Sequence, residues 1–194
     1  MNNETVVSGN EISLKKALKV PFIVTFLAAV LLVAAFFMPL KTAKGDYREV
    51  LLQAADAINV PEIKMTNKAA VNVSMFEYTR AYQALIGSIS KTWSAIGTAF
   101  FVAVGVLSVI TFIFTLCRKP VAIIIFDILT FGAYSIVAAA CRSVSDRYYD
   151  FGAGYYIYYV AIVAVFVGAV WMLVKKSKTK KIMRAETSMS QSDN

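Results

Sequence analysis

The chain has 194 residues, of which 58% are apolar and only 16% charged, and its formal net charge is +8. Soluble domains carry about 25% charged residues, so this composition favours a protein that places its apolar surface in lipid. There is no histidine and there are only two cysteines, Cys117 and Cys141, which excludes histidine-based catalytic or metal sites and a disulfide framework.

The first predicted element is an apolar segment over residues 20–40, which follows a polar tail over residues 1–19. A membrane-spanning helix needs roughly 20 mostly apolar residues, and this segment has that length. It is longer than the apolar part of a signal peptide, and lysines follow it, so we expect an uncleaved helix. Pro21 is expected at the start of this helix, where its missing N–H is tolerated.

The long connection over residues 41–92 predicts a cap made of two helices. Asp46 and Glu49 have the spacing of a capping box, and Ser74 and Glu77 repeat it. We expect the second of these helices to continue directly into the next apolar segment. The connection is too short to bury much core of its own, so it should pack on the ends of the long helices. A structural cap and a headpiece that binds partners both remain open.

The second apolar segment covers residues 93–117 and has small or hydroxyl side chains along one side. Such residues let helices approach closely and hydrogen-bond to each other, so we interpret this stripe as a helix contact. A hydrophilic pore lining is the alternative, and the absence of charge along the stripe weighs against it. The stripe consists of Thr98, Gly105, Ser108 and Thr115.

The third apolar segment, residues 120–141, contains one charged residue, Asp127. A carboxylate in hydrocarbon costs at least a few kcal/mol, so it normally faces other helices and finds a partner there. Helical spacing places Thr130 and Tyr134 on the same side. These three residues form our candidate intramembrane polar site, which serves either as an ion or proton path or as a link between helices.

The fourth apolar segment, residues 155–174, begins in a run of tyrosines. Asp150 is expected to cap its start. Tyr155 and Tyr159 share one face of the helix and could line a pocket under the cap, whereas the run as a whole spreads around the helix. Tyrosine and tryptophan collect where lipid meets water, so we predict an interfacial belt. The belt consists of Trp93, Tyr155, Tyr156, Tyr158, Tyr159 and Trp171.

The positions of lysine and arginine predict the orientation, because cytoplasmic segments carry an excess of both. The N-terminal tail, the short connection with Arg118 and Lys119, and the tail over residues 175–194 are basic. We therefore expect a multi-pass protein of the cell membrane with both termini in the cytoplasm. These bases flank apolar segments, so they indicate topology and not a nucleic-acid partner.

Three short motifs carry a resemblance. VSMFEY precedes the second apolar segment, CRKP precedes the third, and FGAGYY opens the fourth. In this order, over most of residues 20–175, the chain resembles a class of small bacterial four-helix integral membrane proteins that has no established activity. The resemblance implies a bacterial cytoplasmic membrane and no site residues. Claudin and tetraspanin signatures are absent, because the long connection contains no cysteine.

The fold expected from these patterns is all-α, with four transmembrane helices and a helical extracytoplasmic loop. No phosphate loop or dinucleotide motif is present, and we expect a non-enzymatic protein without a cofactor. The leading hypothesis is a scaffold or accessory subunit that contacts the bilayer and engages another membrane protein, or a second copy of itself, through its outer loop or helix faces. The alternative is a small transporter or channel subunit that uses Asp127.

Overall fold

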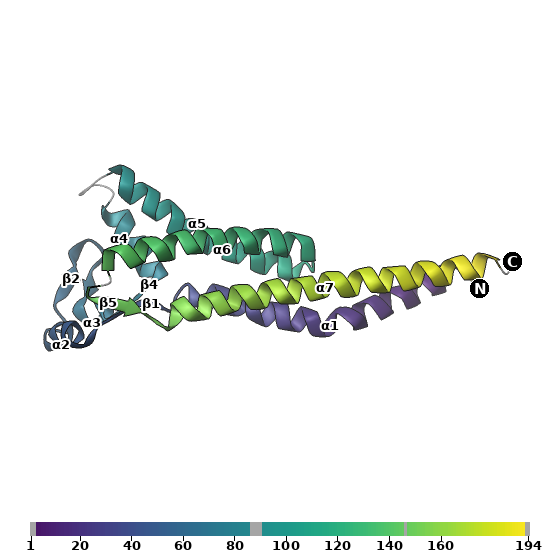
Figure 1. Ribbon diagram of the computed structural model, residues 1–194, viewed down its shortest axis with the longest axis horizontal. Coiled ribbons are helices and arrows are strands. Elements are labelled where there is room, and N and C mark those ends of the chain that lie inside the picture. Colours follow the sequence, from purple (N-terminus) through teal and green to yellow (C-terminus); the bar gives the residue numbers. More distant parts are fainter. Residues whose placement is uncertain (1–2, 86–90, 146, 193–194) are drawn as a thin grey trace.

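The computed structural model is an elongated bundle of four long helices with a small cap at one end (Figure 1). It describes residues 3–85, 91–145 and 147–192. Both chain ends lie at the end of the bundle opposite the cap, so we call the two ends of the molecule the cap end and the tail end. The long helices are α1 (Asn3–Ala35), α5 (Lys91–Leu116), α6 (Pro120–Ser145) and α7 (Ala153–Ser192).

Each long helix contains a stretch that is long and apolar enough to cross a membrane. The first predicted helix differs in its ends, because α1 stops at Ala35 and the chain enters a strand at Pro39. Pro21 lies inside α1 and not at its start. The Thr25 hydroxyl donates to the Pro21 carbonyl at 2.7 Å, one turn later in the same helix. The apolar stretches are Leu18–Ala35, Ser94–Leu116, Pro120–Arg142 and Ala153–Ile182.

All four long helices bury one stripe of side chains whose spacing alternates between three and four residues. This is the heptad pattern of helices that pack at a small left-handed crossing angle. The residues of this stripe are Leu18, Pro21, Thr25, Ala28, Leu32 and Ala35 on α1; Ser94, Phe101, Val104, Ser108, Thr111 and Thr115 on α5, where one position between Ser94 and Phe101 is skipped; Ile123, Asp127, Thr130, Tyr134, Val137 and Cys141 on α6; and Gly154, Tyr158, Ala161, Val165, Gly168 and Met172 on α7.

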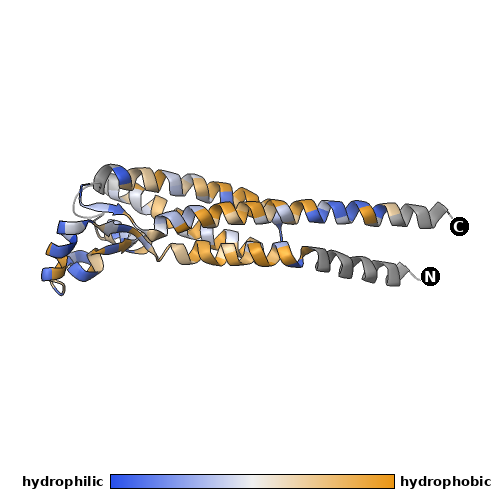
Figure 2. Cartoon of the chain, turned by 60° about the horizontal axis from the view of Figure 1, so that its bottom comes forward, coloured by the Kyte–Doolittle hydropathy of each residue, from blue (hydrophilic) through white to orange (hydrophobic). Residues whose placement is uncertain are grey.

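Helices α1 and α7 lie side by side along most of the bundle (Figures 1 and 2). Their contact depends on Gly168, because a Cβ at this position would lie 3.2 Å from both Cα and Cβ of Thr25. A glycine here lets the two backbones approach closely, as small residues do in membrane helix pairs.

The cap contains a three-stranded antiparallel sheet in the order β4-β1-β5, which the sequence analysis did not predict. The central strand β1 (Pro39–Ala43) follows α1, β4 (Asn72–Ser74) leads into α4, and β5 (Tyr149–Phe151) leads into α7. The sheet therefore joins three parts of the chain that are far apart in sequence. Strands of three to five residues are too short to show a clear period-two pattern.

The rest of the cap packs around a small apolar core of its own. The predicted first cap helix is wrong in its details, because α2 (Gly45–Gln53) has Lys44 at its N-cap, with no capping side chain, and places Asp46 inside its first turn. The core residues are Ala43, Leu51, Met65, Ala70, Val71 and Val73. The other elements are β2 (Ile58–Val60), the 3-10 helix η1 (Pro61–Ile63), β3 (Met65–Thr66) and α3 (Asn67–Ala70).

The second predicted cap helix, α4 (Met75–Leu85), starts with the expected capping box. The Ser74 N–H donates to Glu77 Oε2 at 2.7 Å, and the Glu77 N–H donates to Ser74 Oγ at 3.2 Å. These reciprocal bonds satisfy two backbone donors that the first turn of a helix leaves open. The capping-box prediction at this position is confirmed.

The predicted continuation of α4 into the second long helix is wrong, because α4 folds back along α5. The Tyr78 ring stacks on the Phe101 ring of α5, with centroids 5.6 Å apart. One turn further along α4, Tyr82 lies against Gly97, where a Cβ would be 2.8 Å from the tyrosine ring. Residue numbers rise along α4 as they fall along α5, so the two helices are antiparallel.

Candidate functional site: a polar layer inside the helix bundle

A polar layer divides the apolar interior of the bundle. Towards the cap end, the core cluster includes Leu32, Val104 and Tyr134, and towards the tail end a second cluster includes Ala28 and Ile123. Between them, helices α5, α6 and α7 contribute side chains with hydroxyl or carboxyl groups that are at most 1% exposed. These residues are Ser108, Thr111, Asp127, Thr130 and Tyr158.

Each hydroxyl group of the layer already donates a hydrogen bond. Ser108, Thr111 and Thr130 each donate to the carbonyl four residues earlier in their own helix, at 2.7, 2.9 and 2.7 Å. Tyr158 of α7 forms a short hydrogen bond with Ser108 of α5. A hydroxyl has a single proton, and that of Ser108 points to its own helix, so Tyr158 is the donor in this bond.

Asp127 is 1% exposed, and its Oδ1 atom has no hydrogen-bond partner among the described residues. The bases nearest in sequence point elsewhere: the Arg118 guanidinium lies over the Phe22 ring at 4.4 Å, and Lys119 lines a groove at the tail end. Asp127 is close enough to Tyr158 to interact with it electrostatically. The layer thus places acceptor oxygens beside a buried carboxyl group, an arrangement suited to a bound proton or cation and not to an anion.

The structure places the three predicted site residues Asp127, Thr130 and Tyr134 on one buried stripe of α6. Only the first two belong to the polar layer, because the Tyr134 hydroxyl donates to the Tyr155 carbonyl at 3.0 Å, towards the cap end. Sequence reasoning did not connect Tyr158 with this site. The available signal was the heptad spacing of α7, which puts Tyr158 on the buried stripe.

The residues of the predicted packing stripe on α5 do not share one neighbouring helix, because each has a different environment. A Cβ on Gly105 would lie 3.1 Å from the Phe36 ring, which belongs to the turn after α1. The Thr115 hydroxyl donates to the Thr111 carbonyl at 2.9 Å. The Thr98 hydroxyl is buried and has no hydrogen-bond partner within the described part of the chain.

Most of the tyrosines at the start of α7 belong to one aromatic cluster and do not spread around the helix. The rings of Tyr155, Tyr158 and Tyr159 lie 6.2, 4.2 and 4.9 Å from the ring of Tyr134, measured between centroids. Tyr156, which is 61% exposed, points away from the bundle. Tyr155 and Tyr159 share one face, as expected, whereas the expected spread is wrong for Tyr158, because the buried heptad stripe of α7 includes Tyr158.

The two tryptophans and Asp150 complete the set of predicted residues. Trp171 is exposed on the half of α7 nearer the tail end, and the side chain of Trp93 lies outside the described residues. Asp150 does not cap α7; it lies in β5, and its Oδ1 forms an ion pair with Lys44 Nζ at 3.2 Å. This ion pair joins the residue that follows the central strand β1 to the edge strand β5.

Lys41 is a buried charged residue whose role sequence reasoning missed. It lies in β1 and is 0% exposed. Its Nζ lies 3.9 Å from the centroid of the Phe151 ring, which is a cation–π distance. The Phe151 ring stacks on Tyr155, with centroids 3.9 Å apart. From the sequence, Lys41 was indistinguishable from the charges of a solvated loop, because only the sheet turns its side chain inward.

The chemistry of the described residues is limited. No three histidine, cysteine, aspartate or glutamate side chains in that part of the chain lie together as metal ligands. Cys117 is exposed near the tail end, and Cys141 is buried near the cap end. The polar layer is the main concentration of buried hydroxyl and carboxyl groups, and the apolar clusters bound it on both sides.

Comparison with known proteins adds no family to this description. No protein-family model, curated protein or solved structure matches the chain.

Proposed function

We propose that the chain is a multi-pass membrane protein with its tail end in the cytoplasm and its cap outside. The four long apolar helices support insertion. Large apolar side chains exposed around the bundle also support it, since soluble proteins rarely expose such extended apolar surface. Basic residues at the tail end favour this orientation. The exposed side chains include Val106, Ile113, Ile125, Val163 and Val167.

The protein acts, in this proposal, as a non-enzymatic scaffold or accessory subunit that engages a partner through its cap. The observation that carries the proposal is the way the cap is attached. Its central strand continues from α1, and its edge strands lead into α4 and α7. Because α4 packs along α5, these connections join the cap to the bundle at three points and keep its surface in a defined position, as a docking surface requires.

The far part of the cap exposes apolar side chains. Val50 and Leu52 on α2 are 60% and 45% exposed, although Leu51 between them is buried, and Ile58 in β2 is 60% exposed. In the proposed orientation these residues lie in water outside the membrane. Exposed apolar side chains on a small domain favour a contact with another protein.

Site-specific cross-linking in native membranes tests this function. A photoreactive amino acid at Leu52 or Ile58 should cross-link to a partner protein or to a second copy, while the same group at the exposed polar positions Glu62 and Arg80 should not. The substitution Leu52→Asp should reduce the size of the native complex and leave the monomer inserted. Equal cross-linking at all four positions would contradict a docking role for the cap.

A second candidate, a small transporter or channel subunit, is favoured by the buried carboxyl of Asp127. Four helices enclose little space, so this function would need an oligomer. Proteoliposomes separate the two candidates: the transport function expects Asp127→Asn to abolish proton or cation flux. The scaffold function expects no flux that depends on Asp127, and effects of the substitution on assembly or stability only.

A further inference from the structure

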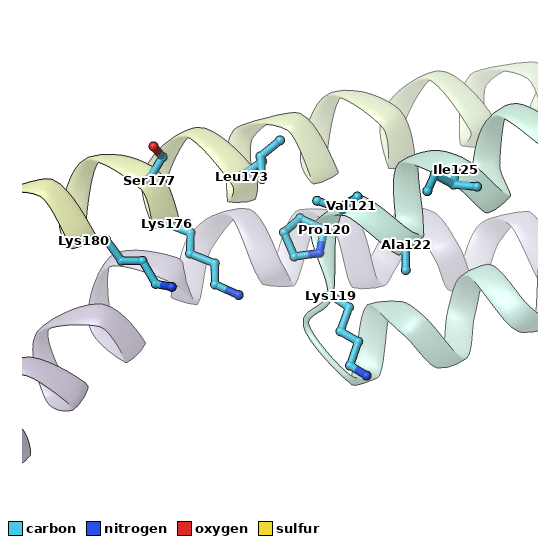
Figure 3. Close-up of a pocket in the computed structure, with 9 residues that line it drawn as sticks. All are labelled: Lys119, Pro120, Val121, Ala122, Ile125, Leu173, Lys176, Ser177 and Lys180. Atoms are coloured by element: carbon cyan, nitrogen blue, oxygen red, sulfur yellow. The ribbon is translucent and has the colours of Figure 1, made fainter.

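A groove of about 600 Å³ lies at the tail end of the bundle, between the first turns of α6 and residues 173–180 of α7 (Figure 3). Helix α6 and the residue before it contribute one wall, and α7 contributes the other. The lining residues are Lys119, Pro120, Val121, Ala122, Ile125, Leu173, Lys176, Ser177 and Lys180.

The lining has two chemically different parts. Val121, Ile125 and Leu173 are apolar and exposed, and they continue the apolar surface of the long helices towards the tail end. Lys176 and Lys180 are four residues apart on α7, so they share one helix face, and Figure 3 shows both extending from the same side of the helix. A ligand that fits both parts has a hydrocarbon chain and an anionic group.

No acid of the neighbouring part of α7 or of the first turn of α6 neutralises the positive charge of the groove. The sequence of α7 from residue 153 to residue 185 contains no aspartate or glutamate. Within the described part of the chain, Lys119, Lys176 and Lys180 form no ion pair. The groove also meets the N-terminus of the 26-residue helix α6, which carries the positive end of the helix dipole.

We propose that this groove binds an anionic phospholipid, with the phosphate among Lys119, Lys176 and Lys180 and an acyl chain along Val121, Ile125 and Leu173. The inference rests on the proposed insertion in a membrane, which puts the groove at the level of the cytoplasmic headgroups. Basic pockets between helices on that side attract anionic headgroups. A soluble anion would leave the apolar half of the groove without an occupant.

The same tail provides a matched control for this site. Lys178 and Lys181 carry the same charge, are exposed, and do not line the groove. If the tail attracts lipid only through its net charge, the double variants Lys176→Ala/Lys180→Ala and Lys178→Ala/Lys181→Ala should behave alike. If the groove binds a lipid, only the first should lose it.

The test measures lipid retained by the purified full-length protein in native mass spectrometry, after exchange into detergent with phosphatidylglycerol or phosphatidylcholine. We expect one phosphatidylglycerol per chain to be retained selectively. A lysine near an anionic surface contributes about a five-fold change in affinity, so removing Lys176 and Lys180 should weaken retention roughly 25-fold. The Lys178/Lys181 control should retain the lipid within about two-fold of wild type.

Three results would overturn the lipid site: equal losses in both double variants, equal retention of phosphatidylcholine, or displacement of the lipid by glycerol phosphate at similar concentration. The last result would indicate an anion site without a lipid. Extraction with alkaline carbonate tests insertion separately. Release of the protein by carbonate would overturn the membrane proposal and the lipid site together, whereas an inserted protein without lipid selectivity would overturn the lipid site alone.

Discussion

The hydroxyl of Tyr158 on α7 hydrogen-bonds the side chain of Ser108 on α5, and this bond joins two helices through the polar layer. Both residues are at most 1% exposed. Removing either hydroxyl should destabilise the bundle by about 1 kcal/mol, as expected for a single buried hydrogen bond. Unfolding of Tyr158→Phe and Ser108→Ala in detergent measures this loss.

The double variant is the control for that prediction. Because both substitutions remove the same bond, the double variant should be no less stable than the worse single variant, which gives a coupling of roughly 0.6 kcal/mol or more. Strictly additive losses would mean that the two hydroxyls do not interact in the folded protein.

Replacing Asp127 with asparagine should leave the stability of the bundle unchanged or raise it. The amide has the shape of the carboxyl group, carries no charge and offers N–H donors, which the acceptor-rich layer lacks. Thermal unfolding in detergent measures the effect, with Thr130→Val as a neighbour that removes a hydroxyl bonded only within its own helix. A loss above about 2 kcal/mol in Asp127→Asn would show that the ionised carboxylate is itself needed, as for a bound metal cation.

Replacing Gly168 or Gly132 with alanine should change the stability of the protein in opposite directions. A Cβ at Gly168 would collide with Thr25 across the α1–α7 contact, whereas a Cβ at Gly132 would meet nothing within 4 Å. We expect Gly168→Ala to destabilise the protein by about 1–3 kcal/mol through overpacking. Gly132→Ala should stabilise it by roughly 0.5–1 kcal/mol, because alanine loses less conformational entropy in a helix. Equal effects of the two substitutions on the melting temperature would contradict this account of the contact.

The cap should lose stability at alkaline pH through Tyr149. Burial raises the pKa of its phenol, and the hydroxyl donates to the Ala70 carbonyl at 3.0 Å. The folded pKa is above the unfolded value of about 10, so the stabilisation is complete below that pH and is lost as the pH rises beyond it. Hydrogen exchange of the cap against pH should show this loss, and Tyr149→Phe should make it less steep. Burial also raises the pKa of Tyr78 and Tyr82, so part of the pH dependence of cap stability should persist in Tyr149→Phe.

A wild-type profile and a Tyr149→Phe profile of the same steepness would contradict the role of this phenol. At neutral pH, Tyr149→Phe should still weaken the cap, because the hydrogen bond to Ala70 is lost in that variant at any pH.

Several features of the fold were predictable because they depend on local sequence. Apolar runs of about 20 residues predict long helices, since a helix satisfies its backbone hydrogen bonds internally. The Ser74–Glu77 capping box was predictable for the same reason, because its partners are three residues apart. The stripe with Asp127 and Thr130 also follows from helical spacing alone.

Other features required contacts between distant segments. The cap sheet pairs Lys41 with Val73 and with Phe151, and each strand is too short to be recognised alone. The reversal between α4 and α5 depends on the packing of Tyr78 against Phe101. The side chains of Asp46 and Asp150 can both cap a helix, but Asp46 lies inside the first turn of α2. Asp150 forms an ion pair with Lys44, from another part of the cap.

The amino-acid sequence by itself determined four long apolar helices, the basic segments beside them and a carboxyl group within one of them. Only the tertiary structure decided which tyrosines would line the interior, and it gathered Tyr155, Tyr158 and Tyr159 around Tyr134. The physical reason is that length and composition act within one segment, whereas the buried face of a helix depends on its neighbours. The same neighbours brought Tyr158 to Ser108 and made a polar layer from residues on three helices.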